Sequence, residues 1–169
     1  MKLRRTALAL LGAALSLLTV QIGTAQASVG GYGPIVNVAS QGCLGMFRDP
    51  AGDFSLYLVD NDCTGSPERQ WTEQPLGDGW YRIVNQGSGF CLDSRGLFAI
   101  QLSCDDSAGQ RWQQVRQPGM PPNAVQLRNP QNGCLELIAF EPTPGDHSQH
   151  YMLKAGPCGP WNTQWWEIN

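Results

Sequence analysis

The chain has 169 residues, six cysteines and a formal net charge of −3 at pH 7, with 11 Lys and Arg against 14 Asp and Glu. Three of the basic residues lie within the first five positions, and no basic cluster follows them. Because nucleic-acid binding needs clustered Lys and Arg to contact phosphates, this balance argues against nucleic acid as a partner.

The first 27 residues have the pattern of a signal peptide. Lys2, Arg4 and Arg5 precede an apolar run over 7–20, and a small-x-small cleavage pattern occupies 25–27. Removal of this segment leaves 169 − 27 = 142 residues with a net charge of 8 − 14 = −6. The apolar run is too short for a comfortable membrane span, and no later run is longer. We therefore expect a secreted, extracellular protein.

Beyond a glycine-rich lead-in over 28–34, short runs of strand-like residues alternate with turn residues and form three units. The units span about 35–76, 77–120 and 121–169. Four strands are predicted in each unit: 35–38, 43–47, 56–59 and 69–74; 80–85, 90–93, 99–104 and 110–115; 125–128, 134–140, 151–154 and 164–168. Three four-strand units fit an all-β β-trefoil, a closed barrel capped by three hairpins with pseudo-threefold symmetry.

The cysteines and tryptophans repeat with the units. Each second cysteine lies eight residues before a closing tryptophan, and each opening cysteine is followed by leucine. The repeat predicts one disulfide within each unit and one tryptophan per unit in a shared core. The predicted bridges and their tryptophans are Cys43–Cys63 with Trp71, Cys91–Cys104 with Trp112, and Cys134–Cys158 with Trp166.

Catalytic and metal sites have little support in the sequence. A zinc site is disfavoured because no CxxC pair exists and the cysteines are evenly spread. His147 and His150 form the one histidine pair, directly after Asp146 and the turn-rich insertion over 141–146. No Gly-x-Ser-x-Gly or phosphate-binding loop is present. We expect no enzyme activity, no cofactor and no metal.

The motifs of the units resemble those of ricin B-chain type β-trefoil lectins. Cys-Leu-Asp at 91–93 is followed by a second cysteine and a Gln-x-Trp motif at 110–112, and Gln-x-Trp recurs at 164–166. In the first unit, Arg69 stands at the glutamine position. The resemblance covers essentially the whole chain after the signal peptide and implies a carbohydrate-binding β-trefoil.

In that family a carboxylate accepts hydrogen bonds from two sugar hydroxyls, an aromatic ring stacks on the sugar, and a polar residue beside Gln-x-Trp completes the site. For the second unit the resemblance implies Asp93 and Gln110. Leu102 stands at the ring position, so Phe98 in the preceding loop is the candidate ring. Asp93 can instead be a turn residue that bonds its own backbone, and Gln110 can instead hold a loop.

In the third unit Glu136 replaces the aspartate, and Gly156 stands at the ring position. Tyr151 and Trp161 are nearby in sequence, and Trp161, in a loop, is the candidate ring, although it can instead cover a hairpin. The first unit has Gly45 at the carboxylate position. The resemblance therefore implies that this unit has a structural role and no sugar site.

Two functions remain open. The first is a secreted, non-catalytic lectin-like protein whose partners are glycans or glycoconjugates. The second is a targeting or interaction subunit of a larger secreted assembly, similar to the trefoil subunits of cytolethal distending toxins, with a protein partner and degenerate sugar sites.

Overall fold

The computed structural model describes residues 31–48, 54–59, 63, 65–96, 98–138 and 152–168. The predicted signal peptide, most of the lead-in and the histidine pair lie outside the described residues. Among the helices that the structure describes, none is long and apolar enough to cross a membrane.

Twelve strands and three single-turn 3-10 helices make up the described chain, which confirms the all-β prediction. The strands are β1 (Ile35–Asn37), β2 (Cys43–Arg48), β3 (Phe54–Val59), β4 (Trp71–Gly77), β5 (Trp80–Asn85), β6 (Cys91–Asp93), β7 (Ile100–Leu102), β8 (Gln113–Val115), β9 (Ala124–Asn129), β10 (Gly133–Ile138), β11 (Met152–Gly156) and β12 (Trp166–Ile168). The helices are η1 (Pro67–Arg69), η2 (Ala108–Gln110) and η3 (Asn162–Gln164).

Each Gln-x-Trp motif differs from the prediction, because its first residue ends a 3-10 turn instead of beginning a strand. Gln110 closes η2 and Gln164 closes η3, while Arg69 closes η1 at the equivalent position. The tryptophan that follows lies at or next to the start of the fourth strand.

Six strands close into a barrel. Strand β12 pairs with β1, β4 with β5, β8 with β9, and β9 with β12, all antiparallel. Two isolated bridges complete the ring: Gly33 with Trp71 joins the start of β1 to β4, and Tyr81 with Trp112 joins β5 to the start of β8. This closure pairs strands that would otherwise be exposed edges.

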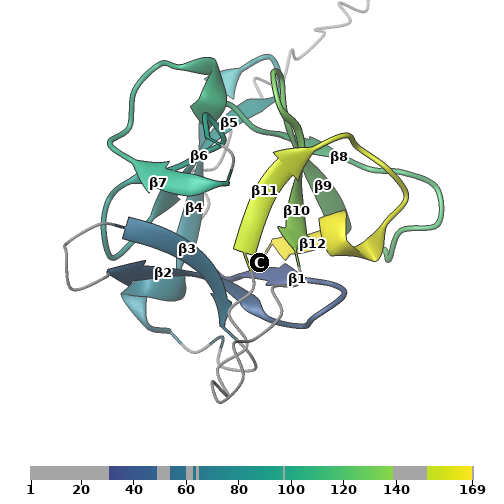
Figure 1. Ribbon diagram of the computed structural model, residues 1–169, viewed down its shortest axis with the longest axis horizontal. Coiled ribbons are helices and arrows are strands. Elements are labelled where there is room, and N and C mark those ends of the chain that lie inside the picture. Colours follow the sequence, from purple (N-terminus) through teal and green to yellow (C-terminus); the bar gives the residue numbers. More distant parts are fainter. Residues whose placement is uncertain are drawn as a thin grey trace, which may run out of the picture.

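The remaining strands form three hairpins, β2–β3, β6–β7 and β10–β11, which surround the centre of the molecule in Figure 1. The hairpins touch one another: Ser55 of β3 pairs with Ile100 of β7, and the backbone N–H of Ala99 donates to the carbonyl of Leu153 in β11 at 2.8 Å. The β-trefoil prediction is confirmed by this arrangement.

The core is apolar and includes one tryptophan from each unit. All three indoles are buried in a single cluster with leucines of the three units. Each indole N–H also donates to the carbonyl of the leucine after the opening cysteine, which pairs the polar atom of a large buried side chain. These bonds are Trp71 to Leu44 at 2.8 Å, Trp112 to Leu92 at 3.0 Å and Trp166 to Leu135 at 3.0 Å.

The disulfides follow the predicted pairing, Cys43–Cys63, Cys91–Cys104 and Cys134–Cys158. Each closes the hairpin of its own unit. Bridges that close loops of this length stabilise a fold by roughly 2–4 kcal/mol each.

A ring of three buried asparagines joins neighbouring units. Asn37, Asn85 and Asn129 end the first strands of the three units, and each Oδ1 accepts from the two backbone N–H groups that lie two and three residues later. Each Nδ2 donates to carbonyls of the 3-10 turn in the preceding unit, so that Asn85 holds η1, Asn129 holds η2 and Asn37 holds η3.

The ring fixes each Gln-x-Trp turn from outside its own unit. Asn129 makes the fullest set, with Nδ2 at 2.8 Å from the carbonyl of Ala108, 3.1 Å from that of Gly109 and 3.0 Å from that of Arg111. Because buried backbone carbonyls need hydrogen-bond partners, these bonds bear directly on stability.

Candidate functional site

Equivalent places for a site occur in the three units, between the first strand of each hairpin and the 3-10 turn that packs against it. The carboxylate position on these strands is occupied by Gly45, Asp93 and Glu136. Gly45 is buried and has no side chain to bind a ligand. A carboxylate is therefore present in the second and third units only.

In the second unit, Arg95 covers Asp93. Asp93 is fully buried, with 0% exposure. Its Oδ1 accepts from the Arg95 backbone N–H at 2.7 Å, and its Oδ2 accepts from Arg95 Nε at 2.9 Å and lies 2.8 Å from Nη2. Both carboxylate oxygens are thus engaged by one neighbouring residue.

Asp105 holds Arg95 in this place, and Gly109 leaves room for its side chain. Asp105 Oδ2 lies 3.0 Å from Arg95 Nη2, and a side chain on Gly109 would overlap the Arg95 side chain. The hydrogen bond to Asp93 raises the pKa of Arg95, and bonds from Ser107, together with Arg95, lower the pKa of Asp105. The guanidinium stays charged. It occupies the Asp93 carboxylate and so keeps a ligand from reaching it in the second unit.

Gln110 has a structural contact for each polar atom of its amide. Its Nε2 donates to the carbonyl of Ser103 at 3.0 Å and its Oε1 accepts from the Asp105 backbone N–H at 2.8 Å, inside the fold. Phe98 is exposed on the loop between β6 and β7. The structure therefore gives Gln110 the loop-holding role, and Phe98 belongs to a unit whose carboxylate is covered by Arg95.

The third unit differs because its carboxylate is reachable. The Glu136 side chain is 20% exposed, and Lys154 Nζ, directly across the β10–β11 pair, lies 3.5 Å from Oε2. This distance is longer than that of a tight charge-assisted hydrogen bond. Gly156 flanks the pair and has no side chain to fill the space beside Oε2.

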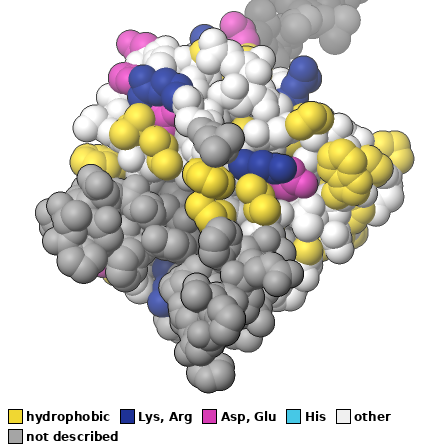
Figure 2. All heavy atoms as spheres, in the orientation of Figure 1, with side chains coloured by type: hydrophobic (Ala, Val, Ile, Leu, Met, Phe, Trp, Pro, Cys, Tyr) yellow, Lys and Arg dark blue, Asp and Glu magenta, His cyan; other side chains and the backbone are white. Residues whose placement is uncertain are grey.

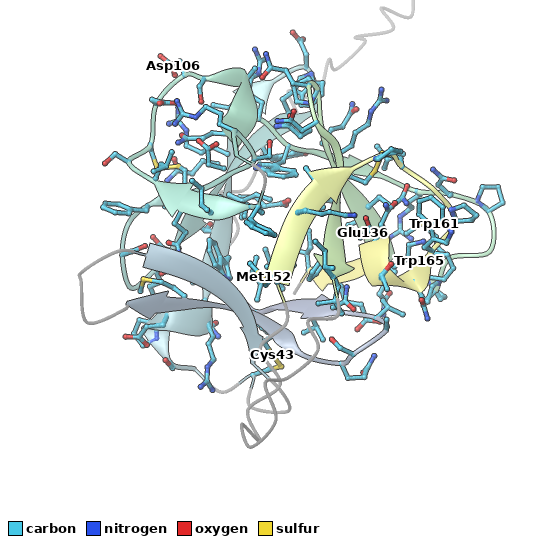
Figure 3. All side chains as sticks on the ribbon, in the orientation of Figure 1. Cys43, Asp106, Glu136, Met152, Trp161 and Trp165 are labelled. Carbon is cyan, nitrogen blue, oxygen red and sulfur yellow. A yellow bond between two sulfur atoms is a disulfide. The ribbon has the colours of Figure 1, made fainter. Side chains whose placement is uncertain are left out.

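Aromatic side chains lie in the same part of the molecule. Trp161 is 51% exposed, in the loop between β11 and η3, and its ring lies close over Gly159. Figure 3 shows Trp161, Trp165 and Glu136 in the part of the molecule that holds β10 and β11. In the same orientation, Figure 2 shows hydrophobic side chains at the surface there, beside one basic and one acidic side chain. The buried indole N–H of Trp165 has no partner among the described residues.

Sequence reasoning did not identify the residues that decide which unit is open. Arg95, two residues after Asp93, and Lys154, opposite Glu136, both contact the candidate carboxylates. The only sequence signal for Arg95 was a basic residue in the turn after Cys-Leu-Asp together with Gly109 beside Gln110. Among the described residues, no group of three His, Cys, Asp or Glu side chains could hold a metal ion.

Residues 20–97 match the family described as ricin-type β-trefoil lectin domain-like, which confirms the resemblance seen in the motifs. No curated protein matches the sequence significantly.

Solved structures with the same fold include a designed threefold-symmetric protein, ThreeFoil, at 21% identity and a TM-score of 0.64, covering 82% of this chain and 97% of that one. A ricin B-like lectin from Macrolepiota procera, solved in complex with lactose, is 18% identical with a TM-score of 0.64 and coverage of 85% and 98%. The cytolethal distending toxin of Haemophilus ducreyi is 17% identical with a TM-score of 0.61 and coverage of 81% of each chain.

Proposed function

Because the fold and the matched segment are those of a ricin-type β-trefoil lectin-like domain, we propose that this chain is a secreted, non-catalytic carbohydrate-binding protein whose working site is in the third unit. The disulfides in each unit fit an extracellular protein. The fold alone does not specify a function, so the proposal depends on the site.

The observation that carries the proposal is the contrast between the carboxylates. Asp93 is buried and held at both oxygens by Arg95, whereas Glu136 is partly exposed and has one loose partner, Lys154. A sugar hydroxyl would have to displace a charged, multiply bonded guanidinium from Asp93. At Glu136 it would meet an oxygen that is already reachable.

The chemistry of the third unit suits a sugar. A carboxylate can accept hydrogen bonds from two neighbouring hydroxyls, and an ammonium can donate to a ring or hydroxyl oxygen. The exposed face of Trp161 can cover the C–H groups of a pyranose ring. Shallow single sites of this kind bind in the millimolar range, about −4 kcal/mol, so useful affinity would need clustered glycans.

The proposal is tested with a glycan array screened with the wild type, Glu136→Gln and Asp93→Asn. Glu136→Gln keeps the shape of the side chain and removes its charge, and we expect it to lose binding to every glycan that the wild type retains. Asp93→Asn should keep the same glycan profile with lower stability, because Asp93 is occupied by Arg95. Binding that survives Glu136→Gln and disappears in Asp93→Asn would place the site in the second unit instead.

A second candidate function has one observation in its favour. Two of the three units offer no open carboxylate, and the structure shares its fold with a cytolethal distending toxin. A targeting subunit with degenerate sugar sites would likewise lack an open carboxylate in most of its units. Co-purification from the native culture medium separates the candidates: a stoichiometric protein partner supports the subunit, and a monomer that binds glycans supports the lectin.

A further inference from the structure

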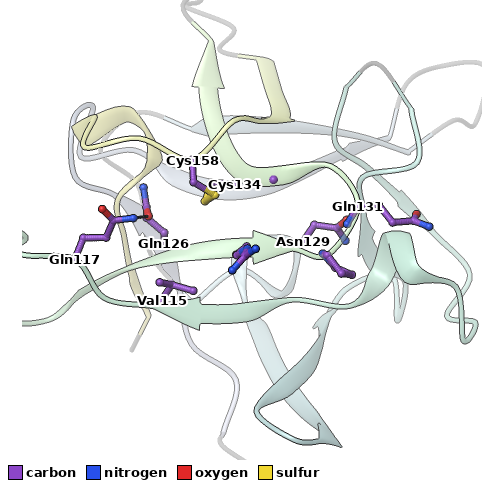
Figure 4. A pocket seen from close by; sticks show the side chains of 10 residues that line it. Val115, Gln117, Gln126, Asn129, Gln131, Cys134 and Cys158 are labelled. Atoms are coloured by element: carbon purple, nitrogen blue, oxygen red, sulfur yellow. Dashed lines mark hydrogen bonds between the residues drawn. A yellow bond between two sulfur atoms is a disulfide. The ribbon is translucent and has the colours of Figure 1, made fainter.

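A cavity of about 370 Å³ lies beside the β8–β9 ribbon and shares no lining residue with the proposed glycan site. Figure 4 shows Gln117 and Gln126 at one end, Asn129 and Gln131 at the other, and the Cys134–Cys158 disulfide on one wall. A volume of this size is at the lower end for small-molecule pockets, and a monosaccharide fits it.

The lining is polar, and its only charged member is Arg128. Four of its side chains are amides, and no Asp or Glu lines it. The wall at the Gln117 end is fixed by a hydrogen-bonded series in which Gln117 Nε2 donates to Gln126 Oε1 at 2.9 Å and Gln126 Nε2 donates to Gln164 Oε1 at 3.1 Å. These bonds hold the amide wall in position before a ligand arrives.

The charge of Arg128 is unpaired among the described residues. Every other Arg or Lys whose side chain the structure describes has a contact, including Arg82 with Asp106, Arg95 with Asp93 and Lys154 with Glu136. Arg111 lies over the Trp80 ring, and Arg116 donates to the carbonyl of Pro122. In a chain with net negative charge, a guanidinium without a carboxylate partner in an acid-free cavity is available for an anion.

We propose that this cavity binds a sugar that carries a carboxylate, with Arg128 contacting the carboxylate and the amides of Gln117 and Gln131 contacting hydroxyls. The other two amides, Gln126 and Asn129, are buried and hydrogen-bonded within the fold, and they shape the wall. The planar guanidinium matches a carboxylate through two parallel hydrogen bonds. The exposed Gln131 amide supplies a further donor and acceptor at the opposite end from Gln117. Charge selects the ligand class, and the amides favour a hydroxylated ligand over a bare anion.

The inference is tested by titrating ¹⁵N-labelled, oxidised protein with glucuronate, glucose and acetate in parallel. Glucuronate and glucose differ at one carbon, so their comparison isolates the carboxylate, and acetate isolates the anion from the sugar. We expect glucuronate to shift the side-chain amide of Gln131 and the backbone amides of 128, 129 and 131–133, with an affinity at least about tenfold above that of either other ligand.

Arg128→Gln removes the charge from an exposed side chain, so the fold should be kept, and glucuronate binding should weaken by about tenfold or more. Arg111→Gln makes the same charge change outside the cavity and should leave binding unchanged. Equal affinity for glucuronate and glucose, or unchanged glucuronate binding in Arg128→Gln, would overturn the proposal. Acetate binding as tightly as glucuronate would overturn its sugar component. The signals within 128–133 report on this cavity, whereas Glu136 and Trp161 report on the proposed glycan site. A negative result in the cavity is therefore distinguishable from a negative result at the glycan site.

Discussion

The asparagine ring makes a quantitative prediction at Asn129. The substitution Asn129→Asp keeps the size and the Oδ1 acceptor that serves the N–H groups of Gln131 and Asn132. It replaces the Nδ2 donor with an oxygen that faces three carbonyls, those of Ala108, Gly109 and Arg111. The perturbation therefore removes the inter-unit bonds and leaves the local turn bonds in place.

The magnitude follows from those three bonds. Each contributes about 1 kcal/mol net, and the introduced carboxylate adds repulsion with carbonyl oxygens in a buried place. We expect the free energy of unfolding at pH 7 to fall by roughly 3–5 kcal/mol, a large share of the 5–15 kcal/mol typical of a domain. Burial and the facing carbonyls disfavour the ionised form of the introduced carboxyl. Its pKa is raised in the folded state, and the loss should diminish as the pH falls below that pKa.

Urea denaturation followed by tryptophan fluorescence, under non-reducing conditions, measures the change. The control is Asn123→Asp, which makes the same charge change at an exposed turn residue with no hydrogen bond shown for its side chain. If Asn129→Asp unfolded within about 0.5 kcal/mol of Asn123→Asp at pH 7, the inter-unit role of the ring would be refuted, because surface changes alone have effects of that size.

Two further predictions concern burial and the turns. Burial raises the pKa of Glu73, whose Oε1 has no partner among the described residues while Oε2 accepts from Gln114. The wild type should therefore lose stability relative to Glu73→Gln as the pH rises from 4 to 7, and calorimetry that showed no pH-dependent difference would contradict this. Gly89 and Gly133 occupy equivalent turns with φ of 70° and 90°, but only at Gly133 would a side chain overlap the carbonyl of Gly156. By urea denaturation, Gly133→Ala should cost roughly 3–5 kcal/mol and Gly89→Ala about 1–2 kcal/mol, and equal losses would show that the overlap is relieved without cost.

The sequence was sufficient to predict the three units, the disulfides and the buried tryptophans because each repeats at a fixed spacing. Cys104 and Trp112, for example, keep the separation found in the other two units, and repetition distinguishes a structural pattern from chance. The 3-10 turn at Gln110 was missed because a three-residue turn has no periodicity of its own.

The state of each site could not be predicted because it depends on how side chains pack in the folded chain. Asp93 matches the family motif, yet Arg95 covers its carboxylate. The Arg95 side chain fits there because Gly109, in the 3-10 turn η2, has no side chain. Asn129 looks like an ordinary turn residue in the sequence, and the carbonyls that accept hydrogen bonds from its Nδ2 belong to the preceding unit. Motif matching identifies which side chain is present, and packing determines whether it can reach a ligand.

The most direct test of the third-unit glycan site is a titration of ¹⁵N-labelled protein with lactose, chosen because it is bound in the Macrolepiota procera lectin structure, observed at the six tryptophan indole N–H signals. Trp161 is exposed in the loop between β11 and η3 of the third unit, whereas Trp71, Trp112 and Trp166 donate to backbone carbonyls inside the core. The account predicts that the Trp161 signal shifts with saturation in the millimolar range while the three core signals stay in place, and that Glu136→Gln abolishes the shift. A shift confined to Trp80 in the second unit, or a Trp161 shift that persists in Glu136→Gln, would contradict it.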